Sequence, residues 1–183
     1  MHLLILVLAA TLYNVEPTNG TVSFSIMKWG VVREEGSFRD FHAKIDYDAR
    51  DAAKSRVEFD VRVASVDTKN KNRDETLLSK DFFDAKRYPN LTFRSVSVKP
   101  RGNNVADVTG DLTIRGVTRR ITVPVRLLGI SRRGNTEVAG FETAFTINRR
   151  AFGVNGDRWS ASVPGILDDN VTIRIMAGGT RKP

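Results

Sequence analysis

Apolar side chains recur at every second position in about eight stretches of the chain, which is the spacing of strands with one buried face. In the stretch TVSFSIM, for example, Val22, Phe24 and Ile26 fall on one face. The stretches cover residues 21–27, 41–47, 56–65, 91–93, 108–114, 121–127, 139–147 and 171–177. The sequence therefore predicts an all-β protein, with one domain between about residues 20 and 177.

Turn residues between these stretches indicate hairpins. Arg115-Gly116 separates two alternating runs, and the segments KPRGNN and SRRGNTE have similar Gly-Asn turn chemistry. Antiparallel strands in hairpin order form a sandwich or close into a barrel, and an eight-stranded barrel has room for side chains or one small ligand. Small residues at the inward positions Ala43, Gly110 and Ala139 favour a cavity, whereas neighbouring phenylalanine rings could fill the same space.

One long connection, residues 65–90, has neither alternation nor hairpin signals. Residues 74–79 within it are compatible with a short helix, and the polar segment that follows contains the adjacent pair Phe82-Phe83. Pro89 fixes the entry into the next strand. We expect this connection to cover one end of the barrel, with Phe82 and Phe83 either closing it as ordinary core or gating a ligand tunnel.

The first ten residues, MHLLILVLAA, resemble the apolar core of a signal peptide followed by small residues. The run is far shorter than the ~20 residues of a transmembrane helix. We expect residues 1–10 to be a signal segment, complete or truncated, and residues 11–183 to form the mature domain in the periplasm or outside the cell. The alternative is that the run is the first strand of the domain.

Composition argues against most catalytic chemistry. The chain has no cysteine and only two histidines, His2 and His42, which excludes thiolate chemistry and metal sites built from cysteine or histidine clusters. The segment DTKNKNRDE has oxygen ligands, but Lys69 and Lys71 occupy positions where an EF-hand loop needs oxygens. The net charge of +8 favours anionic partners, yet the arginine pairs are scattered, as on a solvated basic surface. We expect no catalytic residue, no metal and no cofactor.

Two long segments carry a resemblance to a known family. SVDTKNKNRDETLLSKDFFDAKRYPNLTFRS and GDLTIRGVTRRITVPV are similar to the YceI-like family of lipid-binding proteins. EGSFRDFHAKIDYD and FTINRRAFGV match the same family in the same order. The resemblance implies an extended, lipocalin-like, eight-stranded antiparallel barrel that holds a polyisoprenoid or a fatty-acid derivative. Lys28 and Thr76 stand where the family often has histidine, so the headgroup preference stays open.

From the inward positions and the long connection we expect a set of candidate ligand-binding residues. They are Phe24, Ile26, Phe41, Ile45, Phe59, Val61, Phe82, Phe83, Phe93, Leu112, Val123, Phe141, Phe145 and Ile173. The expected partner is a polyisoprenoid or another long-chain lipid, with a homodimer left open, at most peripheral membrane contact and no nucleic acid. Two other functions stay open, an enzyme acting on an apolar substrate and a basic barrel that stacks nucleic-acid bases on exposed aromatic residues.

Overall fold

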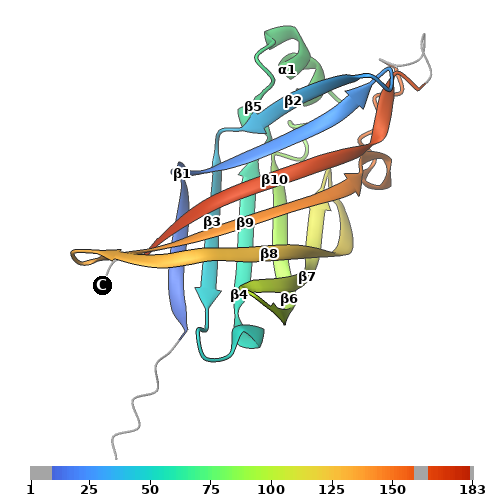
Figure 1. Ribbon diagram of the computed structural model, residues 1–183. Coiled ribbons are helices and arrows are strands. Elements are labelled where there is room, and N and C mark those ends of the chain that lie inside the picture. The colour runs from blue at the N-terminus through green and yellow to red at the C-terminus, as the bar shows by residue number, and fades with distance from the viewer. Residues whose placement is uncertain (1–9, 159–164, 182–183) are drawn as a thin grey trace, which may run out of the picture.

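The computed structural model describes residues 10–158 and 165–181, which are built almost entirely of strands (Figure 1). The strands are β1 (Thr11–Lys28), β2 (Val32–Phe38), β3 (Phe41–Tyr47), β4 (Arg56–Arg62), β5 (Val66–Asp67), β6 (Asn90–Gly102), β7 (Val105–Ile114), β8 (Val117–Arg133), β9 (Thr136–Asn148) and β10 (Leu167–Arg181). Short 3-10 helices lie at η1 (Ala52–Lys54), η2 (Val63–Ser65) and η3 (Arg149–Phe152), and an α-helix, α1, at Lys71–Leu78. No helix in the described ranges is long and apolar enough to cross a membrane. The predicted signal segment lies outside these ranges except for Ala10.

Pairing between neighbouring strands closes the sheet. The order runs β10, β9, β8, β7, β6, β4, β3 and β1, and β1 pairs back onto β10. All of these pairings are antiparallel. The predicted eight-stranded antiparallel barrel is therefore confirmed. β2 and β5 extend the sheet beyond it, because β2 pairs with the second half of β1 while β3 pairs with the first half.

The first strand begins earlier than the alternation predicts. A register shift between Val15 and Gly20 interrupts the pairing of β1 with β10. Tyr13 and Val15 are buried in the core before the shift, whereas Val22 and Phe24 line the barrel cavity after it, so the inward phase changes from odd to even positions. A bulge adds a residue and switches the face that points inward. Because alternation fails across the bulge, the sequence pattern missed residues 11–20 as part of the barrel.

The helix also begins earlier than expected. α1 starts at Lys71 rather than at residue 74, because the side chain of Asn70 caps it by accepting a hydrogen bond of 3.1 Å from the backbone N–H of Arg73. The hairpin predictions are confirmed. Arg115 and Gly116 have φ of 51° and 74°, and they join Ile114 directly to its cross-strand partner Val117. Both φ values are those of the tight turns that suit the twist of a hairpin.

β2 was not predicted, for a different reason. Its sequence, VREEGSF, carries charges on both faces, and only Phe38 in it is buried. The strand lies at the edge of the sheet, where only the two residues of β5 pair with its outer side. A strand with so little buried surface has no alternating pattern to detect.

Candidate functional site

A cavity of about 330 Å³ runs through the interior of the barrel. This volume is in the range of small-molecule binding pockets. The inward-facing side chains that line it include Val22, Phe24, Ile45, Val57, Phe59, Val61, Leu91, Phe93, Val98, Ala106, Val108, Leu112, Ile114, Val123, Val125, Leu127, Phe141, Thr143, Phe145, Ile173, Ile175 and Ala177. Every barrel strand contributes to the wall.

The cavity wall is apolar along its length. Among the described residues that line it, Glu142 is the only charged one. Its carboxylate lies 3.2 Å from the guanidinium of Arg126, and both side chains are largely exposed to solvent. The wall therefore offers hydrophobic burial, worth about 25 cal/mol per Å² of apolar surface, and no fixed charge for a headgroup.

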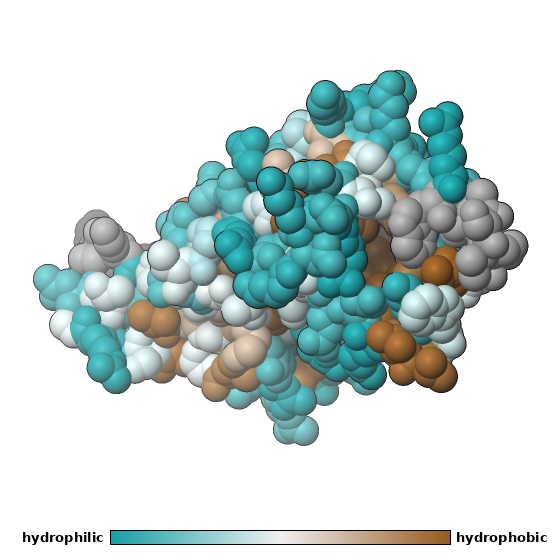
Figure 2. Space-filling model, turned by 90° about the horizontal axis from the view of Figure 1, so that it is seen from above, coloured by the Kyte–Doolittle hydropathy of each residue, from teal (hydrophilic) through white to brown (hydrophobic). Residues whose placement is uncertain are grey.

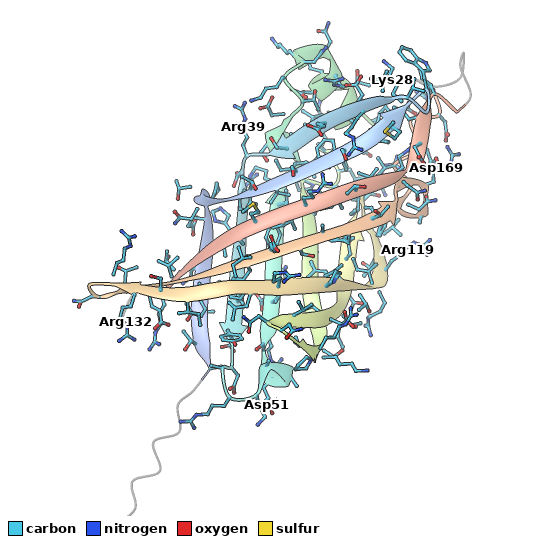
Figure 3. The ribbon with its side chains drawn as sticks, in the orientation of Figure 1. Lys28, Arg39, Asp51, Arg119, Arg132 and Asp169 are labelled. Carbon is cyan, nitrogen blue, oxygen red and sulfur yellow. The ribbon has the colours of Figure 1, made fainter. Side chains whose placement is uncertain are left out.

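One end of the cavity reaches the surface. Pro100, Gly102 and Asn104 belong to the β6–β7 hairpin and line the cavity, although all three are exposed. Ala52 of η1 lines the same end. Figure 3 labels Asp51, the N-cap of η1, at the end of the barrel far from Lys28. We call this end the mouth.

Phe82 packs at the other end of the cavity. Its ring is 4% exposed and packs in a cluster with Leu112, Ile114, Phe152 and Val154, which we call the plug. Leu112 and Ile114 also line the cavity, so the plug forms the floor of the tunnel. The aromatic pair in the long connection thus lies opposite the mouth.

Two arginines fasten the plug through backbone carbonyls. Arg115 donates to the carbonyl of Gly153 at 2.6 Å and to that of Lys80 at 2.8 Å, which joins the two loops around Phe82. Arg149 is 7% exposed and donates to the carbonyl of Val154 at 2.8 Å. Burial lowers the pKa of the Arg149 guanidinium from its ordinary value. These arginines come from the segments GDLTIRGVT and FTINRRAFGV, which are among those that carry the family resemblance.

The Arg73-Asp74 pair anchors α1 over the same end. Asp74 accepts hydrogen bonds from the hydroxyl of Thr68 at 2.6 Å and from its backbone N–H at 2.8 Å. Arg73 donates from Nε to the Thr68 hydroxyl at 2.9 Å and forms an ion pair with Glu34 on β2. Figure 2 looks down on this end, where hydrophilic residues cover most of the surface and hydrophobic groups show in the hollow beside them.

Ten of the fourteen predicted ligand-binding residues line the cavity. They are Phe24, Ile45, Phe59, Val61, Phe93, Leu112, Val123, Phe141, Phe145 and Ile173. Alternation identified these residues because side chains on the inward face of a strand in a closed barrel point toward the cavity. Their contact with a ligand stays a prediction.

Four predicted residues lie elsewhere in the fold. Phe82 is in the plug, and Phe83 packs beside it with its ring 6.0 Å from that of Phe38. Phe41 is 2% exposed and stacks on Phe59 at 5.9 Å between ring centroids, as part of the main core. Ile26 is half-buried and does not line the cavity. Period-two alternation gives the face of a strand but not its position along the barrel, so it could not separate Ile26 and Phe41 from the wall. Phe82 and Phe83 were predicted from the long connection, which has no alternation.

The small inward residues do not all provide space. At Gly110 a methyl group would lie 2.4 Å from Cζ of Phe93, so a phenylalanine ring already occupies that position. Phenylalanine rings therefore fill part of the barrel interior, and an open cavity remains beside them. Sequence reasoning also missed the mouth, since Ala52 in η1, Pro100 near the end of β6 and Asn104 in the β6–β7 turn lie outside the alternating stretches.

The positions that depart from the family pattern lie outside the cavity wall. Lys28 Nζ is 3.9 Å from Glu34 Oε1, and the Thr76 hydroxyl donates to the carbonyl of Asn72 at 2.8 Å within α1. Figure 3 shows Lys28 at the end of the barrel opposite Asp51. His42 is exposed, with Nδ1 2.8 Å from Glu16 Oε2, as expected for a surface histidine. Neither Lys28 nor Thr76 lines the cavity.

A closed antiparallel barrel with a plug at one end and an apolar cavity open at the other defines a lipocalin-like class of protein. A family model for the YceI-like domain matches residues 13–177. The chain belongs to the YceI-like family. A UPF0312 protein from Pseudomonas fluorescens is 39% identical over 173 residues, which is 91% of this chain and 84% of that protein.

Solved structures agree with this assignment. The crystal structure of Burkholderia cenocepacia BcnA superposes with a TM-score of 0.79 at 34% identity, and the match covers 90% of this chain and 98% of that chain. The Campylobacter jejuni YceI protein gives a TM-score of 0.73 at 28% identity, over 84% and 88% of the two chains. A polyisoprenoid-binding domain from Saccharophagus degradans has a TM-score of 0.73 at 14% identity over 95% and 99%, a likeness of fold.

Proposed function

We propose that the protein binds a long apolar molecule, a polyisoprenoid or a fatty-acid derivative, inside the barrel and acts without catalysis as a carrier, store or sequestering protein. The observation that carries this proposal is the cavity, which extends from the plug at Leu112 and Ile114 to the mouth at Asn104. Membership of the YceI-like family supports a lipid-binding role. The name of the structural neighbour from Saccharophagus degradans suggests the polyisoprenoid class.

The shape of the cavity favours a chain-like ligand over a compact one. The cavity extends from Leu112 and Ile114 to Asn104, and Glu142, the one charged residue among the described lining residues, is paired with Arg126, so affinity comes from apolar area along the ligand. Each further isoprenoid unit should add to the binding free energy until the chain reaches the plug. Affinity should therefore rise with chain length and then level off.

The nucleic-acid alternative lacks the feature it needs. Base stacking requires exposed aromatic rings beside arginines. All ten phenylalanines are buried or half-buried. Among the described aromatic residues only Trp29 is exposed, at 57%, and it lies in the turn between β1 and β2.

A cavity-blocking variant tests the proposal. Ala106 lines the wall near the mouth, and Ala106→Trp should fill the tunnel there. Thr109→Trp on the same strand is the matched control, because Thr109 faces outward and pairs with Thr122 at 2.8 Å. Binding of diphenylhexatriene, a fluorescent hydrocarbon, should be lost in the first variant and kept in the second. Equal binding by both folded variants would place the ligand outside the barrel.

Export follows as a second part of the proposal. β1 begins at Thr11, so removal of residues 1–10 would leave every described strand whole. The mature chain should begin within a few residues of Ala10 and lie outside the cytoplasm. Intact-mass measurement on protein from the native host tests this, and a full-length cytoplasmic species would contradict it.

A further inference from the structure

A threonine hydroxyl lies without a partner in the wall of the cavity. Within residues 10–158 and 165–181, three side-chain polar atoms are buried and make no hydrogen bond: Nε of Arg115, Oδ1 of Asn155 and Oγ1 of Thr143. Of the three residues, Thr143 lines the cavity. An unpaired buried hydroxyl is unfavourable, because it has lost its hydrogen bonds to water and gained none in the fold.

The neighbours of Thr143 explain why its hydroxyl is unpaired. Phe141 and Phe145 precede and follow it on the inward face of β9. Val125 on β8 and Ile175 on β10 are its cross-strand partners. All four are apolar and line the cavity, so the surrounding wall offers the hydroxyl no side-chain partner.

Other threonines in the barrel are placed differently. Thr109 and Thr122 face each other across β7 and β8 with their hydroxyls 2.8 Å apart, and Thr113 and Thr118 do the same at 2.8 Å. These pairs lie on the outer face, where solvent is also available. Thr143 alone among these five faces the apolar interior, where valine would fit the same space without an unpaired oxygen.

A ligand is the partner that this position suits. A single water held there would have one polar neighbour, whereas buried waters typically make about three hydrogen bonds. Rotation about χ1 between staggered positions can turn the threonine oxygen toward a chain in the tunnel. A hydroxyl or carbonyl oxygen carried by that chain would complete the bond, because a threonine hydroxyl both donates and accepts.

We propose that Thr143 is the polar subsite of the cavity and selects apolar chains that carry one uncharged oxygen group, such as prenyl alcohols or chains with a carbonyl, over plain hydrocarbons. This inference rests on the proposed function. Among the described lining residues the one charged side chain, Glu142, is an anion already paired with Arg126, so the wall offers no cation to a phosphate or carboxylate and favours uncharged ligands.

The test compares two ligands of equal chain length. Geranylgeraniol and the hydrocarbon of the same carbon skeleton without its hydroxyl compete with bound diphenylhexatriene. One neutral hydrogen bond contributes about 1 kcal/mol, so the wild type should prefer the alcohol by about fivefold. Thr143→Val should abolish the preference by weakening alcohol binding, while Thr143→Ser, which keeps a hydroxyl, should retain it. Thr122→Val, which removes an outward hydroxyl, is the matched control and should behave as wild type.

The outcomes separate this inference from the proposed function. If both ligands displace the fluorescent hydrocarbon but the Thr143→Val ratio equals that of the wild type, the binding function stands and the Thr143 subsite is refuted. If the wild type binds neither ligand nor the fluorescent hydrocarbon, both are refuted. If Thr143→Val does not fold, Thr143→Ser decides the question. Loss of the preference for the alcohol in Thr143→Ser would also refute the subsite.

Discussion

Replacement of Phe82 by alanine tests whether the aromatic pair is a structural plug or a gate. The ring is 4% exposed and packs on Leu112, Ile114, Phe152 and Val154. Truncation of a buried phenylalanine costs about 3–5 kcal/mol, with the larger values where the surroundings cannot collapse into the space. The stability lost in Phe82→Ala therefore measures how rigid the plug is.

The loop above the ring is held in place, so collapse is restricted. A methyl group at Gly156 would lie 2.5 Å from Cζ of Phe82, which means that the loop backbone sits directly on the ring. The N–H of Gly156 donates to the carbonyl of Asp81 at 2.9 Å, and Arg149 holds the carbonyl of Val154 at 2.8 Å. We therefore expect Phe82→Ala to cost about 4 kcal/mol, which corresponds to a fall in Tm of roughly 10 °C for a domain of this size.

Urea unfolding and release of diphenylhexatriene should be measured on the same samples. A plug predicts the large loss of stability with little change in release rate, since the mouth lies at the other end of the tunnel. Val96→Ala, at a side chain that is 57% exposed, is the control and should change stability by less than about 0.5 kcal/mol. A loss below about 1 kcal/mol in Phe82→Ala, together with faster release, would refute the plug and favour a gate.

Three further changes test the packing and the electrostatics of the barrel. Arg149→Met should cost about 1–3 kcal/mol in urea unfolding, because it leaves the backbone carbonyls that Arg149 holds without a donor, and unchanged stability would contradict this role of Arg149. Gly110→Ala should cost about 1–3 kcal/mol, since a methyl group would meet the Phe93 ring at 2.4 Å; a stabilised variant would show that the ring moves freely. Burial, then the hydrogen bond to Glu137, raises the pKa of Tyr13 to about 12 from its ordinary value near 10. The folded state thus holds the phenol proton of Tyr13 more tightly than the unfolded state does. The stability that Tyr13 contributes in this way is complete below pH 10 and is lost as the pH rises through 12. Tyr13→Phe should remove this alkaline dependence, and an identical pH profile for both proteins would argue against it.

Much of the barrel could be predicted from the sequence alone. Alternation identified the strands that carry an inward face, because a closed barrel buries every second residue of each strand. The turn at Arg115-Gly116 followed from local backbone chemistry, which does not depend on distant contacts. The apolar character of the cavity wall followed from the same alternation. The resemblance to the YceI-like family added the expected ligand class.

Other features depend on contacts between residues far apart in the sequence. The bulge between Val15 and Gly20 reverses the inward phase of β1, and only pairing with β10 reveals it. The sequence placed Phe82 in a connection expected to cover one end of the barrel, but only the contact with the loop at Gly156 shows how tightly its ring is held there. The same limit hid the role of Thr143, whose hydroxyl is unpaired because of Val125 and Ile175 on neighbouring strands. A period of two determines which face a side chain takes, whereas its height along the barrel and its neighbours are set by strand register and closure.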